Sequence, residues 1–171
     1  MPDADFARAM GDAGPVLRAM LGCAAFAGLR ACEIAALRRE DLDVDAVPAT
    51  LTVWDGKGGG SRIIPLSPTL VELLTVPDLA ATGPLFRRAD GVPMAANTVS
   101  ALVGKYLRSL GIEHTLHALR HWFGTSLYRE TLDLRLTQEM LGHASPATTA
   151  LYAAHSPVRA ASAVDRLRVP G

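Results

Sequence analysis

Residues 117–152 constrain the fold and chemistry of this chain more than any other stretch. His117 and Arg120 are three residues apart, so on a helix they share one face and can reach a single anion together. An amphipathic run over 132–141 predicts a second helix. Gly142 is placed to end that helix, because glycine readily adopts the left-handed conformation found at helix C-termini.

Two further side chains of chemical interest follow this glycine. His143 comes directly after it, and Tyr152 lies nine residues beyond His143. Ser145 and Pro146 predict a helix start between them, with the serine as cap and the proline at the first helical position. Each feature alone is usually structural, since a lone helical tyrosine commonly packs against the core with its hydroxyl bonded. Three such features in one stretch favour a functional site.

Length and charge set the broad class. A chain of 171 residues suggests one domain, and 49% hydrophobic with 5% aromatic residues suits a compact, mostly helical protein. The formal net charge of zero is unusual for a nucleic-acid-binding domain. However, the part after Gly60 carries eleven basic and eight acidic residues, so the larger C-terminal part is mildly basic.

The cysteines and the N-terminus indicate an intracellular protein. Cys23 and Cys32 belong to no cluster of metal-ligand spacing, so we expect two small buried thiols and neither a disulfide framework, a metal site nor a cofactor. No apolar run is long enough to span a membrane, and the start of the chain lacks the pattern of a signal peptide. These features predict a cytoplasmic location.

The pattern along the chain predicts an α+β fold that is mainly α-helical, with a small antiparallel β-hairpin on one edge. Residues 1–14 read as a frayed or partly helical lead-in, and 38–45 as a charged turn. Two β-branched segments joined by a glycine-rich link predict the hairpin. The strands are expected at 50–54 and 61–66, and the helices near 15–27, 67–74, 97–110, 132–141, 145–152 and 158–167, with a further helix starting at a cap on Thr115.

Two cations stand where a chain break exposes them. Arg30 follows Gly28 at a break between two helices, where its side chain can point into a cleft; a surface ion pair with Glu33 is the alternative. Lys57 lies on the glycine-rich tip of the hairpin. A phosphate-binding loop of the P-loop type is excluded there, because no Gly-Lys-Ser/Thr sequence opens a helix.

These motifs together resemble the catalytic domain of the tyrosine recombinases, the phage-integrase family. The resemblance covers about 15–167, and we therefore expect residues 1–171 to form a single catalytic domain without the family's separate N-terminal core-binding domain. This hairpin departs from the family pattern by having Gly59 and Gly60 where bulkier polar residues are usual. The matching motifs are Gly28-Leu29-Arg30-x-x-Glu33, Gly56-Lys57-Gly58 followed by Arg62-x-x-Pro65, His117-x-Leu119-Arg120-His121, Leu141-Gly142-His143 and Thr148-Thr149-x-x-Tyr152.

The resemblance implies a role for each matching residue in cutting and rejoining DNA without a metal or cofactor. Tyr152 is the expected nucleophile that forms a 3′-phosphotyrosyl link, and Lys57 the expected acid for the leaving oxygen. The expected phosphate ligands are Arg30, Arg120 and His143, with His117 assisting proton transfer and with Glu33 and His121 in supporting positions.

The partners implied are a double-stranded DNA recombination site and a homo-tetramer on that DNA, with accessory DNA-bending proteins also possible. In such an assembly the helix expected at 158–167 either covers its own domain or is passed to a neighbour. Two alternatives share the fold: a type IB topoisomerase-like activity, and a DNA-binding protein that has lost catalysis. A plain helical scaffold explains neither Arg30 nor the histidine and tyrosine motifs.

Overall fold

The computed structural model describes residues 1–54 and 60–142, which are mainly helical with one small antiparallel sheet, as predicted. None of the described helices is long and apolar enough to cross a bilayer. The elements are α1 (Asp3–Asp12), α2 (Pro15–Phe26), α3 (Ala31–Ala36), the 3-10 turn η1 (Arg39–Asp41), β1 (Leu42–Asp43), β2 (Thr50–Trp54), β3 (Ser61–Pro65), α4 (Pro68–Leu74), α5 (Ala96–Ser109), α6 (Leu116–Thr131) and α7 (Leu134–Leu141).

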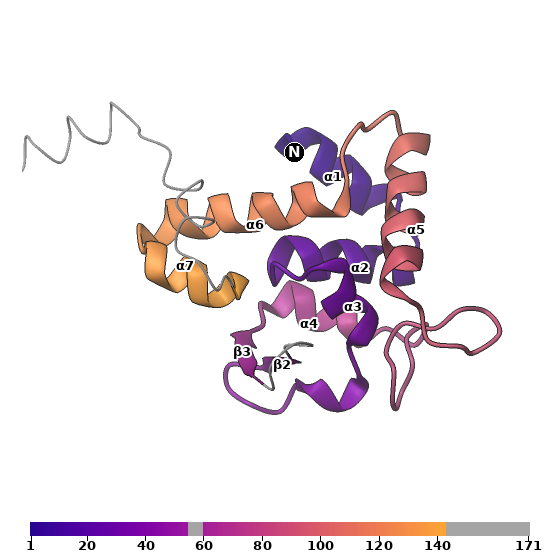
Figure 1. Ribbon diagram of the computed structural model, residues 1–171, viewed down its shortest axis with the longest axis horizontal. Coiled ribbons are helices and arrows are strands. Elements are labelled where there is room, and N and C mark those ends of the chain that lie inside the picture. The colour runs from indigo at the N-terminus through magenta and orange to yellow at the C-terminus, as the bar shows by residue number, and fades with distance from the viewer. Residues whose placement is uncertain (55–59, 143–171) are drawn as a thin grey trace, which may run out of the picture.

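Helix α2 lies at the centre of the fold and contacts α4, α5 and α6 (Figure 1). Its residues 19–25 are all buried, so the helix is apolar on every side, as expected for a helix enclosed by others. Gly22 lets α4 approach closely, because a Cβ there would lie 2.7 Å from a methyl group of Leu73. Gly28 then turns the chain with a φ of 63°, so the predicted end of this helix is confirmed.

The sheet has the strand order β1-β2-β3, and both pairings are antiparallel. Leu51 and Val53 of β2 and Ile64 of β3 are buried, and they mark the face of the sheet that packs on the core. Arg62 pairs with Val53 across the two strands, so its side chain belongs to the same inward face. Strand β3 also contacts α7.

Two segments differ from the prediction. The charged turn at 38–45 contains β1, which pairs with β2 and makes the hairpin a three-stranded sheet. The lead-in at 1–14 contains the ten-residue helix α1. Tertiary contacts hold α1: the ring centroid of Phe6 lies 5.7 Å from that of Phe26 and 4.8 Å from that of Trp122.

Helices α6 and α7 carry the motifs that dominate the sequence. Thr115 occupies the N-cap position of α6 as predicted, although its side chain makes no capping bond. Helix α7 begins after Asp133, whose carboxylate accepts a hydrogen bond from the Leu136 amide at 2.9 Å. It ends at Gly142, which has a φ of 62°. The helix over 132–141 and its glycine terminator are thus confirmed.

Candidate active site

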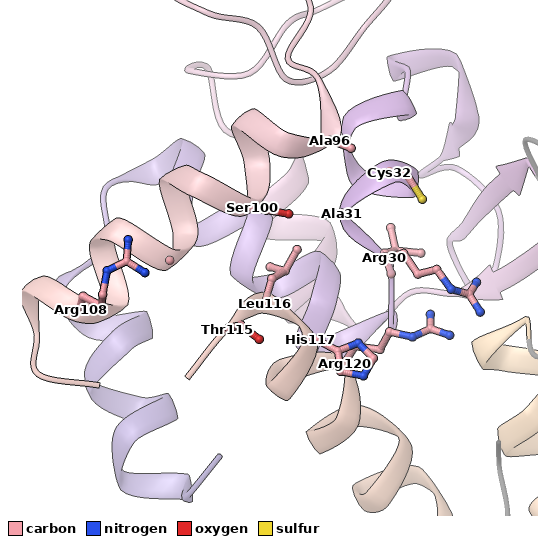
Figure 2. A pocket seen from close by; sticks show the side chains of 12 residues that line it. Arg30, Ala31, Cys32, Ala96, Ser100, Arg108, Thr115, Leu116, His117 and Arg120 are labelled. Carbon is pink, nitrogen blue, oxygen red and sulfur yellow. The ribbon is translucent and has the colours of Figure 1, made fainter. Parts of the chain in front are cut away.

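A pocket of about 730 Å³ lies where the start of α3, one side of α5 and the start of α6 meet (Figure 2). It brings together Arg30, His117 and Arg120, which the sequence analysis took from two separate motifs. The other lining residues are Leu29, Ala31, Cys32, Ala96, Ser100, Gly104, Arg108, Thr115 and Leu116.

Arg30 occupies the N-cap position of α3, just after the turn at Gly28. Its backbone amide donates to Oε2 of Glu33 at 2.7 Å, and its Nη1 donates to Oε1 of the same carboxylate at 3.0 Å. The side chain nevertheless remains 40% exposed and lines the pocket. The ion pair with Glu33 that was the alternative expectation is thus present, and Arg30 is at the same time a residue of the pocket.

Arg120 is buried, with only 2% of its side chain exposed. It donates through Nη1 to the carbonyl of Gly28 and through Nη2 to the carbonyl of Leu141 at 2.7 Å. A buried charge is tolerated only where hydrogen bonds and an opposite charge compensate it, and Glu33 Oε2 lies 3.8 Å from its Nη1. Gly28 cannot be larger, because a Cβ there would lie 2.5 Å from the Phe123 ring.

Glu33 is held most closely by a residue that the sequence analysis did not select, Arg62 of β3. Arg62 donates through Nη1 to Oε1 at 2.8 Å and through Nη2 to Oε2 at 3.0 Å, a two-pronged pair. Burial alone would raise the pKa of Glu33, but the bonds from Arg62 and from the Arg30 amide, together with both positive charges, hold that pKa below its usual range. The carboxylate therefore stays charged at neutral pH.

Three arginines also bind the C-terminal end of α7, one to each of three successive carbonyls. Arg62 Nε donates to Met140 at 3.0 Å, Arg120 Nη2 to Leu141 at 2.7 Å, and Arg30 Nη2 to Gly142 at 3.1 Å. Helix C-termini leave such carbonyls without intrahelical partners and attract cations. The chain directly before His143 is thus fastened to the same three guanidiniums that surround Glu33.

The two histidines of α6 lie in different surroundings. His117 is exposed and lines the pocket beside Arg120 (Figure 2). His121 lies in a separate hollow with Asp3 and Trp122, and its Nδ1 is 3.4 Å from the Thr125 hydroxyl. The sequence expectation that the first histidine of this motif is the one near the phosphate ligands agrees with this placement.

The two cysteines also differ. Cys23 is buried in α2, and burial raises the pKa of its thiol to about 12, so the thiol stays protonated. Cys32 is exposed and lines the pocket, so the expectation that both thiols are buried was wrong for this residue. The difference arises because Cys32 lies on the first turn of α3, whose inward face is taken by Ile34.

Lys57, His143 and Tyr152 lie outside the described residues, as does the helix expected at 158–167. Gly142 is the neighbour of His143 in sequence, and Ser61 and Arg62 begin the strand that follows the Lys57 loop. Within residues 1–54 and 60–142, no three His, Cys, Asp or Glu side chains are grouped so that they could hold a metal ion.

The mainly helical fold with its small antiparallel sheet is that of a tyrosine recombinase catalytic domain, as the following comparisons show. The chain belongs to the Phage integrase family, whose sequence profile matches residues 6–159. It is 39% identical over 134 residues to "Tyrosine recombinase XerA" of Pyrococcus horikoshii, an alignment that covers 74% of this chain and 46% of that protein.

Solved structures share the fold. A crystal structure of XerA recombinase superimposes with a TM-score of 0.79 at 26% identity, and the match covers 99% of this chain and 64% of that one. The XerH site-specific recombinase bound to its difH substrate has a TM-score of 0.75 at 24% identity, covering 95% of this chain and 52% of that one. The chain spans about half the length of the curated relatives it matches.

Proposed function

We propose that this chain is the catalytic domain of a site-specific DNA recombinase, which cuts and rejoins DNA through a 3′-phosphotyrosyl intermediate without a metal or cofactor. The observation that carries the proposal is the convergence of Arg30, His117 and Arg120 on one pocket. The match to the Phage integrase family and relatives named tyrosine recombinase support it. They favour recombination over topoisomerase-like relaxation and over loss of catalysis.

The arginines fit the demands of the reaction at phosphorus. Charge builds up on the non-bridging oxygens as the nucleophile adds, and donors fixed beforehand in that position stabilise it. Arg30 and Arg120 each present a planar fork, which matches phosphate oxygens better than lysine does. Their bonds to Glu33, Gly28 and Leu141 hold the forks in place before DNA arrives.

The chemical step that we propose exchanges one ester for another. The Tyr152 oxygen forms a bond to phosphorus, the bond from phosphorus to the 5′-oxygen breaks, and Lys57 gives that oxygen its proton. His117 takes part in moving the proton from the tyrosine, and His143 donates to a non-bridging oxygen. Rejoining is the reverse reaction, in which a 5′-hydroxyl attacks the phosphotyrosyl link, so no ATP is needed.

The same proposal names the partners. The substrate is a double-stranded DNA site in the cytoplasm, where four copies assemble on two duplexes, with accessory DNA-bending proteins as an additional class of partner. A separate DNA-clamping domain of the kind found in the family completes the grip on DNA. The greater length of the relatives supports the proposal that a second domain accompanies the catalytic domain.

The test is capture of covalent complexes by the full-length protein. Sheared genomic DNA of the source organism is incubated with the protein, and DNA that remains attached through SDS and boiling is sequenced to define the site. We expect wild type to retain one specific site and Tyr152→Phe to retain none, with Tyr128→Phe as the matched control that behaves as wild type. Equal recovery by wild type and Tyr152→Phe would contradict the proposal.

A further inference from the structure

We propose that Arg62 is a positioning residue of this site: it holds Glu33 and the end of α7 against strand β3, and so sets where Arg30 and Arg120 meet the phosphate. The inference rests on the proposed function, since it concerns the same phosphate ligands. It gives a role in the site to a residue that lies outside the pocket and that the hairpin motif contains without assigning it a function.

The Arg62 side chain is largely buried, and its guanidinium is hydrogen-bonded to other parts of the protein. It lies on the inward face of β3 with 15% of its side chain exposed, and it is not among the residues that line the pocket. All three of its guanidinium nitrogens donate to protein atoms: Nη1 and Nη2 to Glu33, and Nε to the Met140 carbonyl. Unlike Arg120, which is also bonded to protein atoms but lines the pocket, Arg62 is placed to hold its neighbours in position.

The absence of a side chain at Gly142 leaves room for the Arg62 guanidinium. A Cβ at Gly142 would lie 2.7 Å from Nη1 of Arg62 and 3.0 Å from its central guanidinium carbon. The glycine therefore serves two purposes, since it supplies the positive φ that ends α7 and leaves room for the guanidinium. Arg62 links three segments distant in sequence: the first catalytic motif, the base of the Lys57 hairpin, and the chain leading into His143.

The charges around Glu33 explain how Arg62 affects Arg30. One carboxylate, Glu33, lies among three guanidiniums, and Arg62 takes up both of its oxygens. Without Arg62, the same carboxylate is free to turn and form the two-pronged pair with Arg30, whose guanidinium now donates only one hydrogen bond to it. A fully paired Arg30 has less positive charge to offer a phosphate. Arg62 thus keeps Arg30 fixed yet incompletely neutralised.

The test measures cleavage by the full-length protein on a suicide duplex, whose nick lets the 5′-hydroxyl strand diffuse away so that the adduct accumulates. We expect Arg62→Gln to lower the single-turnover rate at saturating DNA by about 10- to 100-fold, the range typical when a residue that orients a functional group is lost. The Kd for the duplex should change by less than about threefold, because Arg62 does not line the pocket where the phosphate is proposed to bind. Arg62→Lys should fall between Gln and wild type.

Two comparisons separate positioning from a loss of stability. Arg39→Gln removes another half-buried arginine, which donates to the Leu74 carbonyl at 2.8 Å and does not line the pocket, so it should leave the rate unchanged. In an Arg30→Ala background, Arg62→Gln or Arg62→Lys should cost only a few-fold more, since the main group that Arg62 positions is already gone. A simple loss of folded protein lowers the rate by the same factor in both backgrounds.

The outcomes are distinguishable. Equal rates for wild type, Arg62→Gln and Arg62→Lys, or the same fold-loss with and without Arg30, would overturn the positioning role and leave the proposed function intact. Failure of the wild-type protein to form any adduct with the duplex would overturn the proposed function and this inference with it.

Discussion

Arg120 and Arg108 line opposite ends of one pocket, and the fold treats them in opposite ways (Figure 2). Arg120 is 2% exposed, and it donates to two backbone carbonyls and lies within 3.8 Å of Glu33. Arg108 is exposed, and among the described residues it makes no ion pair. At the Arg120 end of the pocket, called the inner end, the cation is buried and hydrogen-bonded, whereas at the Arg108 end, called the outer end, the cation is exposed to water.

This difference separates two contributions that arginine makes to work on DNA. A guanidinium fixed before the substrate arrives stabilises charge that develops in the transition state, so it should act on the rate. A solvated guanidinium attracts the phosphate backbone and displaces counterions, so it should act on affinity and on its salt dependence. The same residue type should therefore give different kinetic defects at the two ends.

The largest effect is expected from Arg120→Ala. Loss of one fixed donor should lower the single-turnover cleavage rate by roughly 10²- to 10³-fold. The variant also leaves the Gly28 and Leu141 carbonyls without their bonds, so Arg120→Lys is measured beside it as the variant that keeps the charge. Arg129→Ala, on the exposed surface of the same helix, serves as control. A cleavage rate within threefold of wild type for Arg120→Ala would contradict the proposal that the buried Arg120 acts on the rate.

Gly28, whose carbonyl accepts a hydrogen bond from Arg120, should also tolerate no larger residue. Gly28→Ala places a methyl group 2.5 Å from the Phe123 ring at a φ of 63°, so we expect a loss of about 2–4 kcal/mol in the free energy of unfolding. Gly111→Ala is the matched control, because Gly111 has a φ of 69° with nothing within 4 Å of a Cβ. It should cost only the strain of about 1–2 kcal/mol. Denaturant titration measures both, and equal losses would contradict the close packing at Gly28.

A smaller effect should appear in the pH dependence of stability. The pKa of Glu33 is lower in the folded protein than in the unfolded chain, so its ion pairs stabilise the fold fully above the unfolded value of about 4.3. That stabilisation is lost as pH falls through the lowered folded-state pKa. The difference in unfolding free energy between wild type and Glu33→Gln should therefore be constant near neutral pH and shrink in acid. A difference independent of pH from 7 down to 3 would show that the carboxylate's charge contributes nothing.

The smallest effect is expected at the outer end. Arg108→Ala should weaken DNA binding several-fold and reduce the slope of log K against log salt by about 0.9, the value for one lost phosphate contact. The cleavage rate at saturating DNA should not change. Lys105→Ala removes another exposed cation of α5 that does not line the pocket, and it should leave the slope nearer to wild type. A reduced cleavage rate with unchanged DNA affinity for Arg108→Ala would contradict the proposal that the exposed arginine acts on affinity and not on rate.

Local patterns in the sequence were enough to predict the elements that carry their own signals. The helix over 132–141 has an apolar stripe and a glycine terminator, and the hairpin has β-branched arms with a glycine-rich link. Arg30, His117 and Arg120 were found because each lies in a motif. The helix α1 was underestimated, because Phe6 packs on Trp122, which is remote in sequence. No local pattern reports such a contact.

Arg62 belongs to the hairpin motif, but the motif did not predict its role in the site, although the strand pattern carried a signal for it. In an antiparallel pair, residues opposite one another share a face, so Arg62 and Ile64 belong to the buried face with Leu51 and Val53. An arginine at an inward strand position requires a buried acidic partner, and that requirement was readable from the alternation alone. The partner itself was not, because Glu33 lies 29 residues earlier and reaches Arg62 only through the fold.

The most direct test of the central claim is to identify the residue that carries DNA. The trapped complex is digested with nuclease and protease, and mass spectrometry locates the modified peptide among those holding the three tyrosines of the chain. We predict a nucleotide joined through phosphate to Tyr152. Tyr106 is an unsuitable nucleophile because its hydroxyl donates to the Ala9 carbonyl at 2.7 Å and burial raises its pKa. A nucleotide on Tyr106, on Tyr128 or on a serine would contradict the account.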